Sequence, residues 1–208
     1  MIQFSAFNLL KRFGRRTIFE NISFDLHKGN ALAIVGNNGS GKSTLAKICA
    51  GVLSYNSGTI SMTLDNKVVP AELYFQHIGF VSPYLQLYDE FTPFEHIKLF
   101  LEMRDKYLSP EGTTGLLERV NLQHRKDDFV RTFSSGMKQR MKYALALVHS
   151  PEILILDEPT ANLDDEGMKM VFDIMSEQQK KGILIIATNV QSEEERCTSV
   201  IRIGSTKK

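Results

Sequence analysis

The sequence has few of the features that mark extracellular or membrane-spanning proteins. Among its 208 residues are two cysteines, Cys49 and Cys197, and no CxxC pair, which argues against a disulfide scaffold or structural zinc site and suits a reducing compartment. The longest apolar runs, 153–156 and 183–187, are far shorter than the ~18 residues that read as a membrane span. The first residues lack the charged-then-apolar layout of a signal peptide, so we expect no export.

The charge balance also excludes some classes of protein. Lys and Arg number 25 and Asp and Glu 24, for a formal net charge of +1, so bulk charge does not favour nucleic-acid binding and we expect no such partner. Hydrophobic residues make up 42% and charged residues 24%, which is typical of globular proteins and excludes disordered or collagen-like chains. The length fits a single domain, 1–208, with room for a subdomain.

The chain divides into three regions by its hydrophobic pattern. Apolar or alternating segments predict strands at 3–9, 17–26, 30–35, 57–64, 77–81, 153–156, 183–187 and 198–203. Helical signals predict helices at 42–49, 94–107, 115–120, 137–148 and 164–181. We therefore expect an α/β fold with a parallel-sheet core, a mostly antiparallel N-terminal β region and an inserted helical subdomain over about 84–150.

The strongest motif follows the apolar strand at 30–35 and opens the next helix. It is a GxxxxGK[ST] pattern formed by Gly36, Asn37, Asn38, Gly39, Ser40, Gly41, Lys42, Ser43 and Thr44. In such a loop the backbone amides and the helix N-terminus surround phosphate oxygens, the lysine reaches the β- and γ-phosphates, and the first hydroxyl binds Mg²⁺. The alternative is a glycine-rich turn that contains a Gly-Lys pair by chance. Such a turn would not need a strand before it and a helix after it, and both are expected here, so the pattern predicts an ATP and Mg²⁺ site.

Two acidic residues end the apolar strand at 153–156. Asp157 can hold Mg²⁺ or its water, and Glu158 can polarise an attacking water. Alone, these residues would be read as two solvated acids at a strand end. Together with a phosphate loop, which lies at the same edge of a doubly wound sheet, they predict a hydrolytic site.

A serine-glycine turn opens the helix expected at 137–148. Ser134, Ser135, Gly136 and Met137 provide amides and hydroxyls that can face one anion, although a plain helix cap has the same composition.

These three motifs resemble those of the nucleotide-binding subunit of ABC transporters. Between Phe13 and Thr188 the phosphate loop, the helical region, the serine-glycine turn and the acidic strand end follow one another in the family's order. The family signature LSGGQ reads FSSGM here, keeping Ser134 and Gly136 but changing Phe133, Ser135 and Met137. The resemblance implies that Ser134 to Met137 contact ATP bound to a second copy of the chain. It also implies that Phe13 stacks on adenine, while composition alone allows a core phenylalanine equally well.

Two further positions depart from the family pattern. The family has a Mg²⁺-contacting glutamine after the strand at 77–81; Ser82 or Pro83 stands near that place, Gln86 is our candidate and Gln76 a poorer one. Asn189 stands where the family usually has a switch histidine. We expect Asn189 to assist Glu158 and Lys42 in ATP hydrolysis. The rate should be lower than with a histidine, because an amide donates a hydrogen bond but carries no charge.

The resemblance implies an ATPase that powers transport through a separate transmembrane permease. The chain would work as a head-to-tail dimer with ATP between the copies, in the cytoplasm and peripheral on the inner face of the cell membrane. Its compact size is similar to that of small export-type subunits. The alternatives are a non-transport ATPase of the same fold that acts as a switch on a cytoplasmic complex, and a non-hydrolysing ATP-binding regulator, which Asn189 keeps open.

Overall fold

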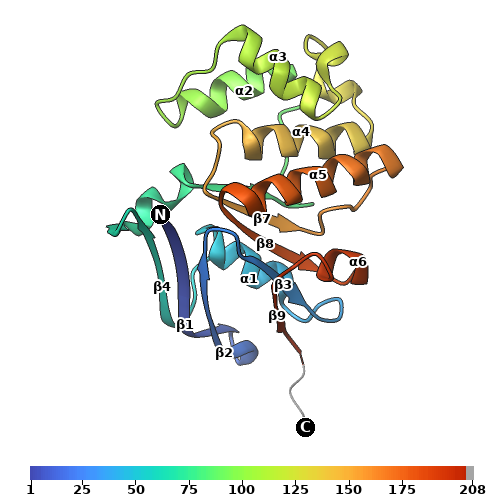
Figure 1. Cartoon of the computed structure of the whole chain (residues 1–208). Helices are drawn as coiled ribbons and strands as arrows, with labels where there is room; N and C mark the ends of the chain where they lie inside the picture. Colours follow the sequence, from blue (N-terminus) through green and yellow to red (C-terminus); the bar gives the residue numbers. More distant parts are fainter. Residues whose placement is uncertain (205–208) are drawn as a thin grey trace.

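The computed structural model describes residues 1–204, and within them it forms two sheets and several helices (Figure 1). The strands are β1 (Ile2–Phe13), β2 (Arg16–His27), β3 (Ala31–Val35), β4 (Ser57–Leu64), β5 (Lys67–Val69), β6 (Ile78–Val81), β7 (Ile153–Asp157), β8 (Ile183–Thr188) and β9 (Ser199–Arg202). The α-helices are α1 (Lys42–Cys49), α2 (Pro93–Glu102), α3 (Pro110–Arg119), α4 (Ser135–Leu147), α5 (Asp165–Lys181) and α6 (Gln191–Glu194), and the short 3₁₀ helices are η1 (Ala71–Gln76), η2 (Gln123–Arg125) and η3 (Val130–Thr132).

The central sheet is parallel, with the order β6-β7-β8-β3-β9. Every residue of β3, β7 and β8 is buried, as expected of apolar strands that are covered on both faces. Successive side chains of a strand point to opposite faces of the sheet. In β3, Leu32 and Ile34 accordingly belong to one apolar cluster, and Ala33 and Val35 belong to the other. The parallel α/β core predicted from the sequence is therefore confirmed.

The N-terminal sheet is antiparallel, with the order β2-β1-β4-β5. Its apolar face packs with α1 and one face of the parallel sheet, so Phe4 and Met62 share a core with Leu45 and Ile34. Helix α1 thus lies between the two sheets, as Figure 1 shows. This packing fixes α1, and with it the loop that precedes α1, against the carboxyl ends of the central strands.

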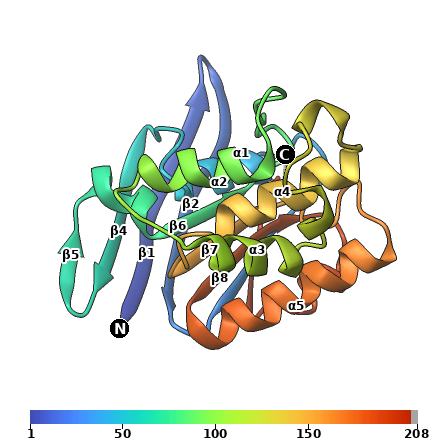
Figure 2. The same cartoon turned by 90° about the horizontal axis from the view of Figure 1, so that it is seen from above.

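The helical region lies on the other face of the parallel sheet. Helix α4 packs on β6, and α2 and α3 pack on α4, away from the sheet (Figures 1 and 2). The helix expected at 94–107 ends earlier, at Glu102, because the chain turns at Arg104 and at Asp105, which has a positive φ of 51°. The helix expected at 115–120 begins earlier, at Pro110, where Ser109 caps it by accepting from the Gly112 amide. A helical subdomain with limits at 84 and 150 stays a prediction.

Within residues 1–204, no helix is both long enough and apolar enough to cross a membrane.

Candidate functional site

The phosphate loop connects the carboxyl end of β3 to the first turn of α1. Gly36, Gly39 and Gly41 all have positive φ, at 156°, 75° and 111°. A Cβ on Gly36 would lie 2.3 Å from the Ile203 carbonyl oxygen, and one on Gly41 would lie 2.4 Å from the Ile18 side chain. Only glycine fits at these two positions, so the loop conformation depends on them.

Lys42 is the first residue of α1, and its side chain turns back into the phosphate loop. Its side chain is buried, and its ammonium donates to the carbonyl oxygens of Gly36 at 2.9 Å and Asn37 at 3.2 Å. The Ser40 hydroxyl is also buried and has no hydrogen-bond partner among residues 1–204. A buried cation beside an unpartnered hydroxyl and the N-terminus of α1 forms a site that suits phosphate oxygens.

Ser43 and the acidic end of β7 meet beside the loop. The Ser43 hydroxyl donates to Asp157 Oδ1 at 2.8 Å, and the Ser82 hydroxyl lies 3.4 Å from Asp157 Oδ2. Burial is the largest effect on Asp157 and raises the pKa of its carboxyl, and the neighbouring Glu158 charge raises it further, against the Ser43 hydrogen bond. Two hydroxyls around a desolvated carboxylate are hard oxygen ligands, and they fit Mg²⁺.

The structure places Gln86, our sequence-based candidate for the family's Mg²⁺-contacting glutamine, and Ser82, which stands near the family's position. Gln86 is exposed and lies in the irregular segment between β6 and α2, and no side-chain hydrogen bond joins it to Ser43 or Asp157 among the described residues. Ser82 is buried and contacts Asp157. The geometry therefore favours Ser82 over Gln86, our sequence-based candidate.

Lys142 of α4 supports Ser82 and was missed by the sequence analysis. Its ammonium is buried and donates to the carbonyl oxygens of Ser82 at 3.2 Å and Pro83 at 2.8 Å. Burial lowers the pKa of this amine. A lysine on the helix that follows the serine-glycine turn thus holds the segment that follows β6.

Glu158 reaches the same opening as the phosphate loop. A cavity of about 500 Å³ is lined by Glu158, Lys42, Ser43, Thr44, Asn38, Gly39 and Gly41, together with Arg16, Ile18, Lys47 and Tyr84. The last four were not singled out from the sequence, because nothing local shows that residues so far apart line one cavity.

Asn189 lies next to this cavity. Its side-chain amide donates to the Asn38 side-chain oxygen at 3.1 Å. A second cavity of about 190 Å³ is lined by Asn189, Glu158 and Asn38, among others. The structure therefore brings Asn189 together with Glu158 and the phosphate loop.

Phe13 lies at the exposed tip of the hairpin between β1 and β2. The residue is 51% exposed, which excludes the core position that composition alone allowed. The Lys11 ammonium lies 4.7 Å from the ring centroid. An exposed ring of this kind is free to stack on a planar ligand.

The serine-glycine turn lies outside the cavity that contains Lys42. Ser134 is the N-cap of α4, and its hydroxyl accepts a hydrogen bond from the Met137 amide at 3.2 Å. Ser134 and Ser135 are exposed, and a Cβ on Gly136 would come within 3.3 Å of the Asn162 carbonyl oxygen. None of the four residues of this turn lines the cavity that contains Lys42 in its own chain.

Comparisons with known proteins give one consistent family. The family model described as "ABC transporter" matches residues 19–161. The ABC transporter ATP-binding protein YdbJ of Bacillus subtilis is 35% identical over 93% of this chain, which spans 63% of that protein's length. The lantibiotic transport ATP-binding protein SrtF of Streptococcus pyogenes is 34% identical over 93% of this chain and 83% of its own length. A solved ATP-binding subunit of an ABC transporter superposes with a TM-score of 0.83 at 27% identity, over 96% of this chain and 85% of that one.

The family model covers more than half of the chain, and two of the three motifs that carried the resemblance, the phosphate loop and the acidic end of β7, meet at one edge of the parallel sheet. The chain therefore belongs to the ABC transporter family, as an ATP-binding domain.

Proposed function

We propose that this protein binds Mg-ATP and hydrolyses it to ADP and phosphate, as the ATPase component of a transporter. One observation carries the proposal: the contact of 2.8 Å between Ser43 and Asp157 brings the phosphate loop to the acidic end of β7, where Glu158 lines the same cavity as Lys42. Binding residues and a candidate base thus share one opening, as an attack on a terminal phosphate requires.

Each residue of the site has a distinct task in this reaction. Lys42 supplies a fixed positive charge for the terminal phosphates, and the amides of the loop supply hydrogen-bond donors. Ser43, Asp157 and Ser82 would hold Mg²⁺, which supplies charge neutralisation between the phosphates when bound. Glu158 orients a water and accepts its proton. Phe13 stacks on adenine at the exposed tip of the hairpin.

A second copy of the chain completes the site in this proposal. The turn formed by Ser134, Ser135, Gly136 and Met137 is the N-terminus of a helix, its two serines are exposed, and it lies outside its own nucleotide cavity. In a head-to-tail dimer it covers the nucleotide of the other copy. ATP then holds the two copies together, and hydrolysis releases them.

The proposed partner in the membrane is a separate permease chain. We place the protein in the cytoplasm, peripheral on the inner face of the cell membrane, where opening and closing of the dimer moves the permease. The transport and lantibiotic names of its relatives support this role. Capture of a polytopic membrane protein with the tagged chain, from detergent-solubilised membranes, tests it; capture of a soluble cytoplasmic complex instead supports the non-transport switch.

The ATPase proposal is tested by Glu158→Gln, which keeps the shape of the side chain and removes the base. The variant should bind Mg-ATP in calorimetry as the wild type does, lose about 10²–10⁴-fold in turnover and form a stable dimer in light scattering. Glu118→Gln, an exposed position on α3, is the matched control and should keep full turnover. Wild-type protein that binds no Mg-ATP, or a Glu158→Gln variant with full turnover, contradicts the proposal.

A further inference from the structure

A buried carboxylate lies next to the hydrolytic site without a task in the mechanism above. Glu193 belongs to the short helix α6, and its side chain is 1% exposed. One of its oxygens, Oε1, accepts a hydrogen bond from the Thr160 hydroxyl at 2.6 Å. The other, Oε2, is buried and has no partner in the part of the chain that the structure describes.

This arrangement is unfavourable for stability. A buried carboxylate with one neutral donor loses its hydration, and a single hydrogen bond does not replace it. Burial, and to a smaller extent the charge of Glu193, raises the pKa of the neighbouring Tyr143 hydroxyl. An unpartnered buried oxygen is an exception among buried polar atoms, and such an exception beside a reactive centre calls for an explanation in terms of the contacts that Glu193 does make.

The partner of Glu193 lies in the turn that carries Glu158. Thr160 is two residues after Glu158, and Glu158 has a positive φ of 51°, an uncommon conformation for a residue with a side chain. The turn is held at a second point by the Tyr143 hydroxyl, which donates to the Pro159 carbonyl oxygen at 2.7 Å. The Glu158 conformation therefore depends on contacts made by the residues that follow it.

Glu193 also belongs to the segment that carries Asn189. Its hydrogen bond to Thr160 ties the chain that follows β8 to the chain that follows β7. All four side chains line the cavity of about 190 Å³: Glu158, Thr160, Asn189 and Glu193. Two hydrogen bonds thus join the segment of the candidate base to that of the switch position: the Glu158 amide donates to the Ala187 carbonyl oxygen at 2.9 Å, and the Thr160 hydroxyl donates to Glu193.

We propose that Glu193 is a positioning residue for hydrolysis, which holds Thr160 and thereby keeps Glu158 in its left-handed conformation, facing the phosphate loop. The proposal rests on the ATPase function proposed above. It needs an acceptor at Oε1 and not a charge, so glutamine satisfies it at this position. It acts on the chemical step and leaves the binding of ATP unchanged, because neither Glu193 nor Thr160 lines the cavity that contains Lys42.

The test compares paired variants of the full chain in steady-state ATPase assays. Glu193→Ala and Thr160→Val each remove the hydrogen bond and should lower kcat about tenfold while KM for ATP changes less than twofold. Glu193→Gln and Thr160→Ser keep an acceptor and a donor and should restore most of the activity. The double variant Glu193→Ala/Thr160→Val should be no slower than either single variant, because both remove the same contact.

A matched control and a binding measurement separate this role from general damage to the fold. Glu195→Ala changes an exposed glutamate at the end of the same helix and should leave kcat unchanged. Calorimetric titration with Mg-ATP counts the folded sites in every preparation, and kcat is expressed per folded site. Thr160→Val, which replaces only the hydroxyl by a methyl group of similar size, keeps the test decisive where Glu193→Ala does not fold.

Three results overturn the inference. Wild-type kcat in both Glu193→Ala and Thr160→Val removes the contact from catalysis. A rise in KM with unchanged kcat assigns the residues to binding. A Glu193→Gln variant as slow as Glu193→Ala shows that the charge matters and not the hydrogen bond. The ATPase proposal fails separately, if the wild-type protein itself neither binds nor hydrolyses Mg-ATP.

Discussion

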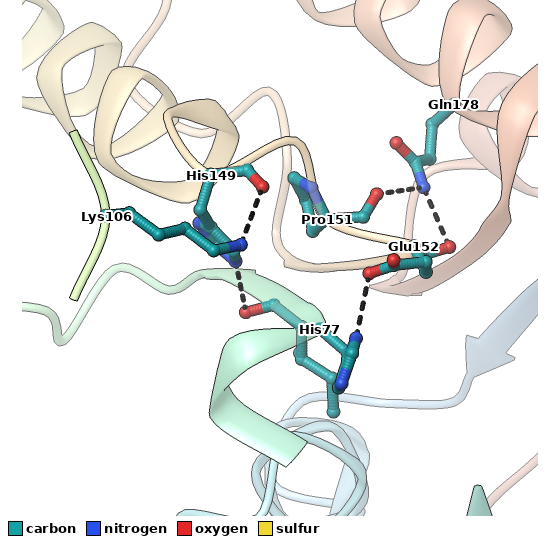
Figure 3. Close-up of polar contacts among 7 residues, drawn as sticks. His77, Lys106, His149, Pro151, Glu152 and Gln178 are labelled. Carbon is teal, nitrogen blue, oxygen red and sulfur yellow. Dashed lines mark hydrogen bonds and ion pairs between the residues drawn. The ribbon is translucent and has the colours of Figure 1, made fainter. Parts of the chain in front are cut away.

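A buried histidine at the edge of the sheet opposite the phosphate loop makes stability depend on pH. His149 follows α4, is 6% exposed and donates through Nε2 to the Ile78 carbonyl oxygen at 3.2 Å. Its Nδ1 is buried and has no partner among residues 1–204. Figure 3 shows Lys106 and the His77–Glu152 pair around it. Protonation of Nδ1 would place a second buried N–H, and a charge, where no acceptor is available.

These surroundings lower the pKa of His149 from 6.5 to about 4. Burial is the largest cause, the positive charge of Arg104 is the second, and Lys106 and His77 add to it against the hydrogen bond to Ile78. Near pH 6.5 the histidine binds a proton in the unfolded chain but not in the folded chain. The contribution of neutral His149 to the free energy of unfolding is therefore fully present above pH 6.5, and it is lost as the pH falls toward 4. Between pH 7 and pH 5 the linkage relation gives a loss of about 2 kcal/mol from this one group.

The assay is urea unfolding of the wild type and of His149→Gln at pH 7 and pH 5. Glutamine keeps a donor for the Ile78 carbonyl and does not titrate, so the variant should lose about 2 kcal/mol less than the wild type over this interval. His124→Gln, at an exposed position of η2, is the matched control and should follow the wild type. Equal losses in His149→Gln and the wild type would refute the account of this histidine.

Three further predictions concern the nucleotide site. Lys42→Ala should weaken Mg-ATP binding about 10- to 100-fold in calorimetry, because it removes a charged hydrogen-bond donor; unchanged affinity would contradict the phosphate-loop assignment. Ser134→Arg should keep ATP binding by the monomer and lose turnover, and a mixture with Lys42→Ala should give at most one competent site per dimer; full activity of Ser134→Arg would exclude its action on the other copy. Ser82→Ala and Lys142→Met should each raise, several-fold, the Mg²⁺ concentration needed to tighten ATP binding, with Mg²⁺-free binding unchanged; the same Mg²⁺ dependence as the wild type would remove Ser82 from the metal site.

Local sequence signals predicted the elements that build the site. Helix α1 has the predicted limits, Lys42 and Cys49, because the phosphate loop precedes it and Gly51 follows it. Strands β7 and β8 were expected from their apolar runs and extend one residue further, to Asp157 and Thr188. These elements are specified by short patterns that do not depend on distant residues.

Contacts between distant residues could not be predicted in the same way. Glu193 is the first of three consecutive glutamates, a pattern typical of a solvated surface, yet it alone of the three is buried. Its partner Thr160 is 33 residues away in the chain, and Lys142 is 60 residues from Ser82. Which member of a charged run faces the interior is decided by packing, and packing is not visible in the spacing of a single sequence.

Asn189 stands where the family usually has a histidine, and the variant Asn189→His tests what the asparagine changes. The asparagine amide already donates to Asn38 of the phosphate loop and lines a cavity with Glu158, so this position faces the reacting groups. A histidine here can donate a hydrogen bond and also carry a charge, whereas the amide can only donate. Turnover in Asn189→His should therefore rise about tenfold, which is less than the roughly 10²–10⁴-fold of a general base, because Glu158 keeps that task.

The matched variant is Asn189→Ala, which removes the hydrogen bond to Asn38 without adding a charge and should turn over more slowly than the wild type. Steady-state ATPase activity of the purified dimer, with calorimetric binding of Mg-ATP as the count of active sites, measures both variants. The three side chains then form a series, from no donor through a neutral donor to a donor that can be charged, and kcat should rise along it with KM for ATP nearly constant. If Asn189→His turns over at the wild-type rate, the side chain at this position does not limit hydrolysis, and the slow step lies elsewhere in the cycle.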